Sequence, residues 1–111
     1  MKDLTTQKCV PCEGGTKPFT KKETEDYLKM TRDWEYISVK IPGIQRKFVF
    51  KDFTEALDFV NKIGRLANAE DHHPDIFIHN YKKVDITLST HAIGGLSTND
   101  FIMAAKINQL V

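Results

Sequence analysis

Residues 53–69, FTEALDFVNKIGRLANA, carry the strongest structural signal in the chain, because their apolar side chains recur at steps of three and four residues. This spacing predicts an amphipathic helix whose apolar face packs on a sheet. Pro74 forces His73 out of helical geometry, so the helix ends before that histidine. Gly64 costs a helix about 1 kcal/mol relative to alanine, and we expect a close approach between helix and strand to be its reason. The predicted apolar face comprises Phe53, Ala56, Leu57, Val60, Ile63, Gly64 and Ala67.

Two pairs of strand-like stretches lie on either side of this helix. Trp34–Ile41 and Gln45–Phe50 alternate between apolar and polar residues and are separated by the turn signal Pro42-Gly43, which predicts an antiparallel pair. Asp75–Asn80 and Val84–Thr90 form a second pair. One face of the last stretch carries its apolar side chains, which are Val84, Ile86 and Leu88.

Two further helices complete the expected fold. Thr20 and Glu23 form a capping box that starts a short helix reaching about Met30. Ser97-Thr98-Asn99-Asp100 starts a last helix that runs through Leu110. The resulting order is α-β-β-α-β-β-α, an α+β fold in which three helices cover one face of a four-stranded antiparallel sheet.

Composition narrows the class of protein further. The 111 residues suit one domain, which we place at 20–111, after an irregular segment, 1–19, whose glycines and prolines prevent a regular element. With 41% hydrophobic residues and a net charge of +1, the chain is neither disordered nor basic enough for a nucleic-acid partner. No apolar run reaches the ~18 residues of a membrane span, and the N-terminus lacks the apolar core of a signal peptide. We therefore expect a soluble, cytoplasmic protein.

A lone C-x-x-C motif, Cys9-Val10-Pro11-Cys12, lies in the irregular segment. A structural zinc site uses four ligands, commonly two such pairs, and a thioredoxin-like motif follows a strand and opens a helix. This motif has no second pair and precedes every predicted strand. An inert thiol pair or a staple within the loop is therefore favoured over a metal or redox site, which stays the alternative.

All four histidines lie between positions 72 and 91, and three of them fall at the ends of predicted elements. His72 and His73 follow the long helix, and His91 follows the last predicted strand. Imidazole both donates and accepts protons near neutral pH, so the pattern suits a general acid/base site. Blander alternatives stay open: adjacent histidines cap a helix C-terminus, Asp100 closes a capping box, and His79 is an ordinary surface histidine. A metal site is disfavoured, because adjacent histidines rarely point at one ion.

Five short blocks, taken together, are far more specific than any single pair of histidines. They are Glu70-Asp71-His72-His73-Pro74-Asp75, Tyr81-Lys82-Lys83-Val84, Leu88-Ser89-Thr90-His91, Gly94-Gly95-Leu96-Ser97 and Asp100-Phe101. In their order and spacing they resemble the pterin-4a-carbinolamine dehydratase family, bacterial type, over most of the chain. The resemblance implies three helices on a four-stranded antiparallel sheet. It also implies a hydro-lyase that dehydrates 4a-hydroxytetrahydrobiopterin to quinonoid dihydropterin, without a metal or an organic cofactor.

The resemblance implies site residues, position by position. His72 and His91 become the proton donor and the proton acceptor. Which of them is the donor stays open, because two nearby imidazoles titrate as a coupled pair. His73 is expected to bind and orient the pterin, and Asp100 to orient a histidine, which completes the expected catalytic group. Asn68 departs from the vertebrate-type pattern, which has a glutamate there. The expected substrate-binding residues are Asp71, His72, His73, Ser89, Thr90, His91 and Ala92.

Expected partners follow from the same resemblance. It implies a pterin substrate, a homodimer or homotetramer, and a functional link to an aromatic amino-acid hydroxylase in tetrahydrobiopterin recycling. The open edges of a four-stranded sheet agree with self-association. The competing hypothesis is a non-catalytic assembly or dimerisation protein on the same fold, since family members also act as dimerisation partners of a transcription factor. The joint presence of His72, His73 and His91 favours the enzyme. Trp34 is expected to fill the core, and stacking near the pterin ring is the alternative.

Overall fold

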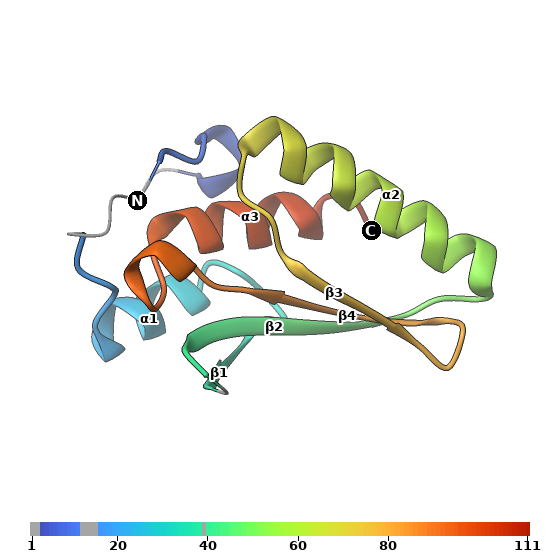
Figure 1. The fold of residues 1–111 in the computed structure, drawn as a ribbon, viewed down its shortest axis with the longest axis horizontal. Coiled ribbons are helices and arrows are strands. Elements are labelled where there is room, and N and C mark those ends of the chain that lie inside the picture. The colour runs from blue at the N-terminus through green and yellow to red at the C-terminus, as the bar shows by residue number, and fades with distance from the viewer. Residues whose placement is uncertain (1–2, 12–15, 39) are drawn as a thin grey trace.

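A four-stranded antiparallel sheet with the strand order β1-β2-β4-β3 forms one layer of the molecule. The computed structural model describes residues 3–11, 16–38 and 40–111. The strands are β1 (Glu35–Ser38), β2 (Pro42–Val49), β3 (Asp75–His79) and β4 (Lys83–Leu88). The helices α1 (Lys21–Leu28), α2 (Phe53–Glu70) and α3 (Thr98–Asn108) lie on one side of the sheet (Figure 1). The predicted α+β fold and its element order are confirmed.

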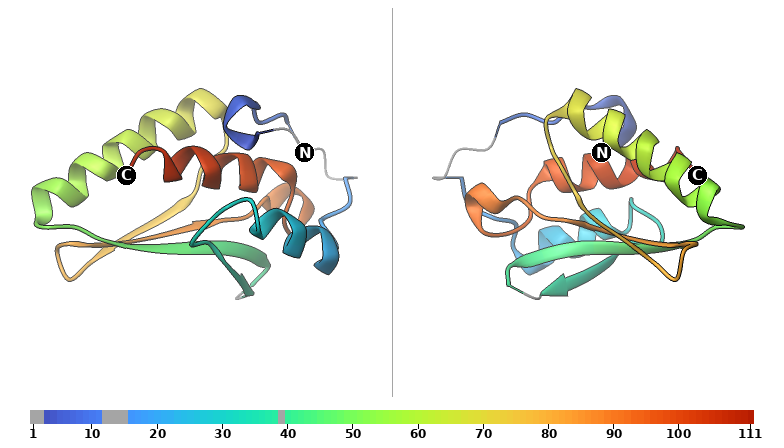
Figure 2. Two further views of the ribbon diagram at one scale, coloured as in Figure 1. Left: turned by 180° about the vertical axis from the view of Figure 1, so that it is seen from behind. Right: turned by 45° about the vertical axis from the view of Figure 1, so that its right-hand side comes forward.

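The hydrophobic core lies between the sheet and the helices, and α3 is the helix most deeply buried in it. Figure 2 shows α2 and α3 from two further directions, both on the same side of the sheet. The predicted apolar face of β4 is confirmed, because Val84, Ile86 and Leu88 are fully buried. Trp34 is also buried, and its Nε1 donates a hydrogen bond of 2.9 Å to Asn108 Oδ1 on α3. Trp34 therefore fills the core.

The buried face of α2 is rotated relative to the predicted one. Phe53 and Leu57 are exposed, whereas Phe59 is buried, with its ring centroid 4.8 Å from that of Phe48. The prediction was wrong here because Phe59 fits the same three- and four-residue steps as its neighbours, so periodicity alone does not choose between the two rows. The buried row consists of Ala56, Phe59, Ile63 and Ala67.

Two predictions about glycine and proline are also corrected. A Cβ added at Gly64 would meet no atom within 4 Å, so no close approach of helix and strand explains this glycine. The close approach occurs at Gly43, where an added Cβ would lie 2.9 Å from the Leu88 backbone oxygen of the neighbouring strand. Pro42 and Gly43 are the first residues of β2 rather than a turn, because the first position of a strand tolerates a residue without an N–H.

The helix starts agree with their sequence signals. Thr20 Oγ1 accepts the Glu23 N–H at 3.2 Å, and Glu23 Oε1 accepts the Thr20 N–H at 2.9 Å. Asp100 likewise accepts the Ser97 N–H, at 3.0 Å. The first strand is shorter than predicted at both ends, and Val39, within the predicted stretch, lies outside the described residues.

The N-terminal segment contains a short element that the sequence did not predict. A single 3-10 turn, η1 (Leu4–Thr6), is capped by Asp3, whose carboxylate accepts the Thr5 N–H at 3.0 Å. Leu4 is buried in the core, which ties this segment to the helical layer (Figure 1). Cys12, the second cysteine of the C-x-x-C motif, lies outside the described residues. Among the helices of the described ranges, none is long and apolar enough to cross a membrane.

Candidate active site

The C-terminus of α2 places the histidine pair. Asp71 ends the helix in the left-handed conformation, with φ at 52°, a geometry common at helix C-termini. The His72 N–H still donates to the Ala67 oxygen at 3.2 Å, so the first histidine stays anchored to the last turn. Pro74 excludes helical geometry just beyond. The chain therefore leaves α2 at a fixed angle, with His72 directed toward the start of α3.

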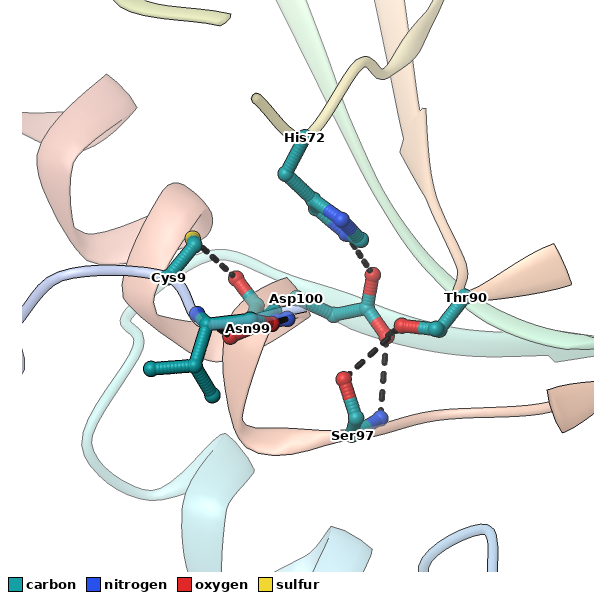
Figure 3. A network of polar contacts seen from close by, with 7 residues as sticks. Cys9, His72, Thr90, Ser97, Asn99 and Asp100 are labelled. Carbon is teal, nitrogen blue, oxygen red and sulfur yellow. Dashed lines mark hydrogen bonds and ion pairs between the residues drawn. The ribbon is translucent and has the colours of Figure 1, made fainter. Parts of the chain in front are cut away.

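A buried carboxylate receives His72. His72 Nε2 lies 2.7 Å from Asp100 Oδ1, and the Asp100 side chain is fully buried, while that of His72 is 12% exposed. The second oxygen, Oδ2, accepts from Thr90 Oγ1 at 2.8 Å and from the Ser97 N–H at 3.0 Å (Figure 3). Both predicted roles of Asp100 therefore coexist, because one oxygen caps the helix while the other orients the imidazole.

The loop that follows β4 places the third histidine of the site, His91. Thr90 and Gly95 form an isolated β-bridge, with the Thr90 N–H donating to the Gly95 oxygen at 2.8 Å. The bridge closes a short loop that contains the 3-10 turn η2 (His91–Ile93). Gly94 ends this turn with φ at 68°, a conformation that glycine adopts without strain. His91 is thereby held, exposed, at the start of η2.

These elements surround one shallow hollow of about 220 Å³. Its lining residues are Val10, Pro11, Asp71, His72, His73, Ser89, Thr90, His91, Ala92 and Asn99. The structure thus brings together all seven residues expected to bind the substrate, with Asp100 buried behind His72. A larger hollow of about 520 Å³, between Leu4, Arg32 and Asn108, contains none of them.

The other two histidines with hydrogen-bonded side chains, His73 and His79, lie in different parts of the molecule. His73 Nε2 lies 3.0 Å from Asn68 Oδ1, so the residue that departs from the vertebrate-type pattern orients this imidazole. His79 Nε2 lies 3.1 Å from Asp85 Oδ1 on the helix-free face of the sheet, and its ring stacks on Phe77. Only the first of the two lines the hollow. Within the described ranges, no group of three or more His, Cys, Asp or Glu residues is arranged to hold a metal ion.

Sequence reasoning missed one wall of the hollow. Val10 and Pro11 line it, and the buried Asn99 side chain holds the Val10 backbone from both sides. Asn99 Oδ1 accepts the Val10 N–H at 3.0 Å, and Nδ2 donates to the Val10 oxygen at 2.5 Å. In the sequence, the C-x-x-C motif indicates only the thiols of this segment, and Asn99 indicates only the start of a helix.

Glu70, the last residue of α2, holds Cys9, the residue before Val10. The Cys9 N–H donates to Glu70 Oε1 at 2.8 Å, and Lys106 Nζ lies 2.9 Å from Glu70 Oε2. Burial raises the pKa of the Glu70 carboxyl, but the Cys9 N–H and the Lys106 ammonium together outweigh it and hold the pKa below its ordinary value. Burial, reinforced by the Glu70 charge, raises the pKa of the Cys9 thiol to about 12. Metal and redox chemistry use the thiolate, so these surroundings disfavour such a role for Cys9.

Fold and site together define a small α+β protein whose hollow is lined by three imidazoles, one of them held by a buried carboxylate. A sequence profile of the family described as "Pterin 4 alpha carbinolamine dehydratase" matches residues 17–110. The chain belongs to this family.

Individual relatives match nearly the whole chain. A protein of Methylococcus capsulatus is 46% identical over 108 residues, which cover 96% of this chain and 92% of the relative. A protein of Nitrosospira multiformis is 42% identical over 108 residues, which cover 97% of this chain and 92% of the relative. Both bear the name "Putative pterin-4-alpha-carbinolamine dehydratase".

Two solved structures share the fold. A protein of Brucella melitensis described as a transcriptional coactivator/pterin dehydratase superposes with a TM-score of 0.77 and 34% identity, over 84% of this chain and 97% of that one. A pterin dehydratase-like protein, described as a RuBisCO assembly factor in the alpha-carboxysome, gives a TM-score of 0.60 and 22% identity, over 71% of this chain and 89% of that one. The second likeness concerns the fold alone.

Proposed function

We propose that this protein is a hydro-lyase that dehydrates 4a-hydroxytetrahydrobiopterin to quinonoid dihydropterin and water. One observation carries the proposal: His72, His73 and His91 line a single hollow, and the buried Asp100 carboxylate holds the first of them. Family membership and the names of the relatives support the same chemistry.

The reaction requires one acid and one base. The hydroxyl on C4a is a poor leaving group until it takes a proton, after which the C–O bond breaks and water departs. The proton on N5 passes to a base, and the electron pair it leaves behind forms the C4a–N5 double bond. One proton is given and one is taken, so a pair of imidazoles balances the reaction without a further reactant.

In this proposal His72 and His91 exchange the two protons. The Asp100 carboxylate accepts from His72 Nε2, which fixes the ring and leaves Nδ1 to exchange a proton with the pterin. His91 serves the other side of the hollow from the start of η2. His73, with Asn68 behind it, orients the pterin. The substrate is also bound by Asp71, Ser89, Thr90 and Ala92.

The breakdown of 4a-hydroxytetrahydrobiopterin, followed by absorbance, tests this proposal. We expect the wild-type protein to exceed the spontaneous rate clearly, and His72→Ala or His91→Ala to lose about 100-fold or more of the acceleration. His79→Ala is the matched control, because that histidine bonds Asp85 on the helix-free face of the sheet. A wild-type protein no faster than the spontaneous reaction excludes the enzyme and favours an assembly protein on the same fold.

We further propose that the protein works in the cytoplasm as a homodimer or homotetramer, in tetrahydrobiopterin recycling beside an aromatic amino-acid hydroxylase. Support for self-association comes from two surfaces. The edge strand β3 exposes Ile76 and Phe77, and α2 exposes Phe53 and Leu57. Light scattering of the purified protein measures the mass. A monomeric mass at micromolar concentration contradicts this part of the proposal.

A further inference from the structure

The Val10–Pro11 wall is fixed by two residues that directly precede site residues in the sequence. Glu70, which holds the Cys9 N–H, stands before Asp71, and Asn99, which holds Val10, stands before Asp100. Both holding side chains are buried, and a buried polar group is costly unless it is hydrogen-bonded. In Figure 3 the Asn99 and Asp100 side chains leave the same turn of α3, the second of them directed at His72. The first turn of α3 therefore holds this wall through Asn99 and orients the His72 imidazole through Asp100.

The backbone of Val10 is held by hydrogen bonds, but its side chain is exposed. It is 63% exposed, although both its N–H and its carbonyl are bonded to one buried amide. Most of the other residues that line the hollow have polar side chains, with carboxylate, hydroxyl and imidazole groups. An exposed apolar side chain at the edge of a polar hollow loses contact with water when a flat ring covers it. Because the Val10 backbone is already hydrogen-bonded to Asn99, less loop entropy is lost when a ligand covers this apolar side chain.

We infer that Val10 and Pro11 form an apolar wall against which the pterin ring packs, and that Asn99 and Glu70 are positioning residues that hold this wall. The inference rests on the proposed function and adds a part of the substrate site. The wall carries no group that transfers a proton, so it contributes to pterin binding and not to the chemical step. Changes here raise KM and the Kd of a pterin, and leave kcat nearly unchanged.

Val10→Ser tests the wall without touching its backbone attachment. We expect the Kd of 7,8-dihydrobiopterin, which lacks the leaving hydroxyl, to rise about three- to tenfold, since apolar contact area is lost. Val49→Ser is the matched control: Val49 is 66% exposed at the far end of β2 and lines no part of the hollow. An unchanged Kd for Val10→Ser excludes a wall in contact with the pterin.

Asn99→Ala tests the positioning role. It removes both bonds to Val10, and we expect KM to rise about tenfold while kcat stays within about twofold. Asn108→Ala is its control, because it removes a hydrogen-bonding asparagine from the other end of α3 and is expected to lower the melting temperature with no change in KM. Equal effects of the two variants on KM would make Asn99 a merely structural residue.

The wild-type protein separates this inference from the proposed function. If wild type dehydrates the substrate and binds the dihydropterin while Val10→Ser and Asn99→Ala bind it equally well, the wall is excluded and the enzyme stands. If wild type neither binds nor dehydrates the pterin, the proposed function and the wall are both excluded.

Discussion

The two ends of α3 carry side-chain hydrogen bonds that look alike but lead to different parts of the molecule. At the first turn, Asn99 bonds the Val10 backbone and Asp100 bonds His72, and both partners line the hollow. Each chain of contacts at this end therefore finishes on a group that a small molecule can reach.

At the last turn, Asn108 accepts from Trp34 Nε1 and from the Arg46 guanidinium, and donates to the Arg32 oxygen at 3.1 Å. The guanidinium of Arg46 also lies over the Phe48 ring, so this end joins α3 to the sheet. The comparison teaches that the polar contacts at the two ends of α3 have different roles. At the first turn they end on groups that line the hollow with the three histidines, and at the last turn they join the helix to the sheet.

Asp100→Asn is expected to give the largest effect, at the first end of α3. The amide replaces a pure acceptor with a group that also donates, so it no longer fixes Nε2 of His72 as the donor. We expect kcat to fall about 10²–10⁴-fold, as when a catalytic imidazole is held in the wrong tautomer. Steady-state dehydration kinetics measure the loss. A kcat within a factor of about two of wild type would contradict the claim that the contacts at this end of α3 serve catalysis.

Asn108→Ala is the corresponding change at the other end, and its effect is on stability. Trp34 Nε1 loses its acceptor, and a buried donor left unpaired costs about 1–3 kcal/mol of unfolding free energy. We expect urea unfolding to show this loss, with the rate of the chemical step retained. A variant as stable as wild type, but slow in dehydration, would reverse the assignment of the two ends.

Glu70→Gln tests the ion pair with Lys106, between the two ends of α3. The folded pKa of Glu70 lies below its ordinary value of 4.5, so the carboxylate stabilises the fold above pH 4.5, and the contribution is lost as pH falls through the folded pKa. We expect Glu70→Gln to cost about 1–2 kcal/mol at pH 7 and to match wild type at strongly acidic pH. Chemical unfolding across this range measures both values. A constant difference at all pH values contradicts the role of the charge.

The smallest expected effect concerns the thiol of Cys9, which donates to the backbone oxygen of Asn99 at 3.6 Å. Its pKa is raised to about 12, so almost none of it is thiolate at pH 8. In a Cys12→Ser background, we expect iodoacetamide to modify the folded protein far more slowly than the urea-unfolded protein. Equal rates in the two states would reopen the metal or redox interpretation of the C-x-x-C motif.

Much of the fold could be predicted because each element carries a local signal. The capping contacts of Thr20 and Glu23 and the alternation around Ile86 correspond directly to observed geometry. Phe59 was missed because its burial is decided by contact with Phe48 on β2, which the period of the helix does not record. Gly43 was missed for the same reason, since its neighbour is the backbone of another strand.

The candidate site was predictable where a resemblance supplied it, and less so from chemistry alone. Composition and spacing indicated an acid/base site at His72, His73 and His91, and only the resemblance singled out His72 and His91 as the pair that exchanges protons. The structure places all three on one hollow. Nothing in the sequence joins Val10 to Asn99, 89 residues later, because a loop that packs on a helix start has no periodicity. Such contacts depend on the whole fold and become visible only in the structure.

One measurement tests the central claim most directly: the dehydration rate of the His72→Ala/His91→Ala double variant beside those of the two single variants. If the imidazoles act as one acid/base unit on the same pterin, each single change removes most of the acceleration and the double variant is scarcely slower than either. If the two losses multiply, or if the double variant retains the wild-type rate, the histidines do not share the reaction and the account of the site is contradicted.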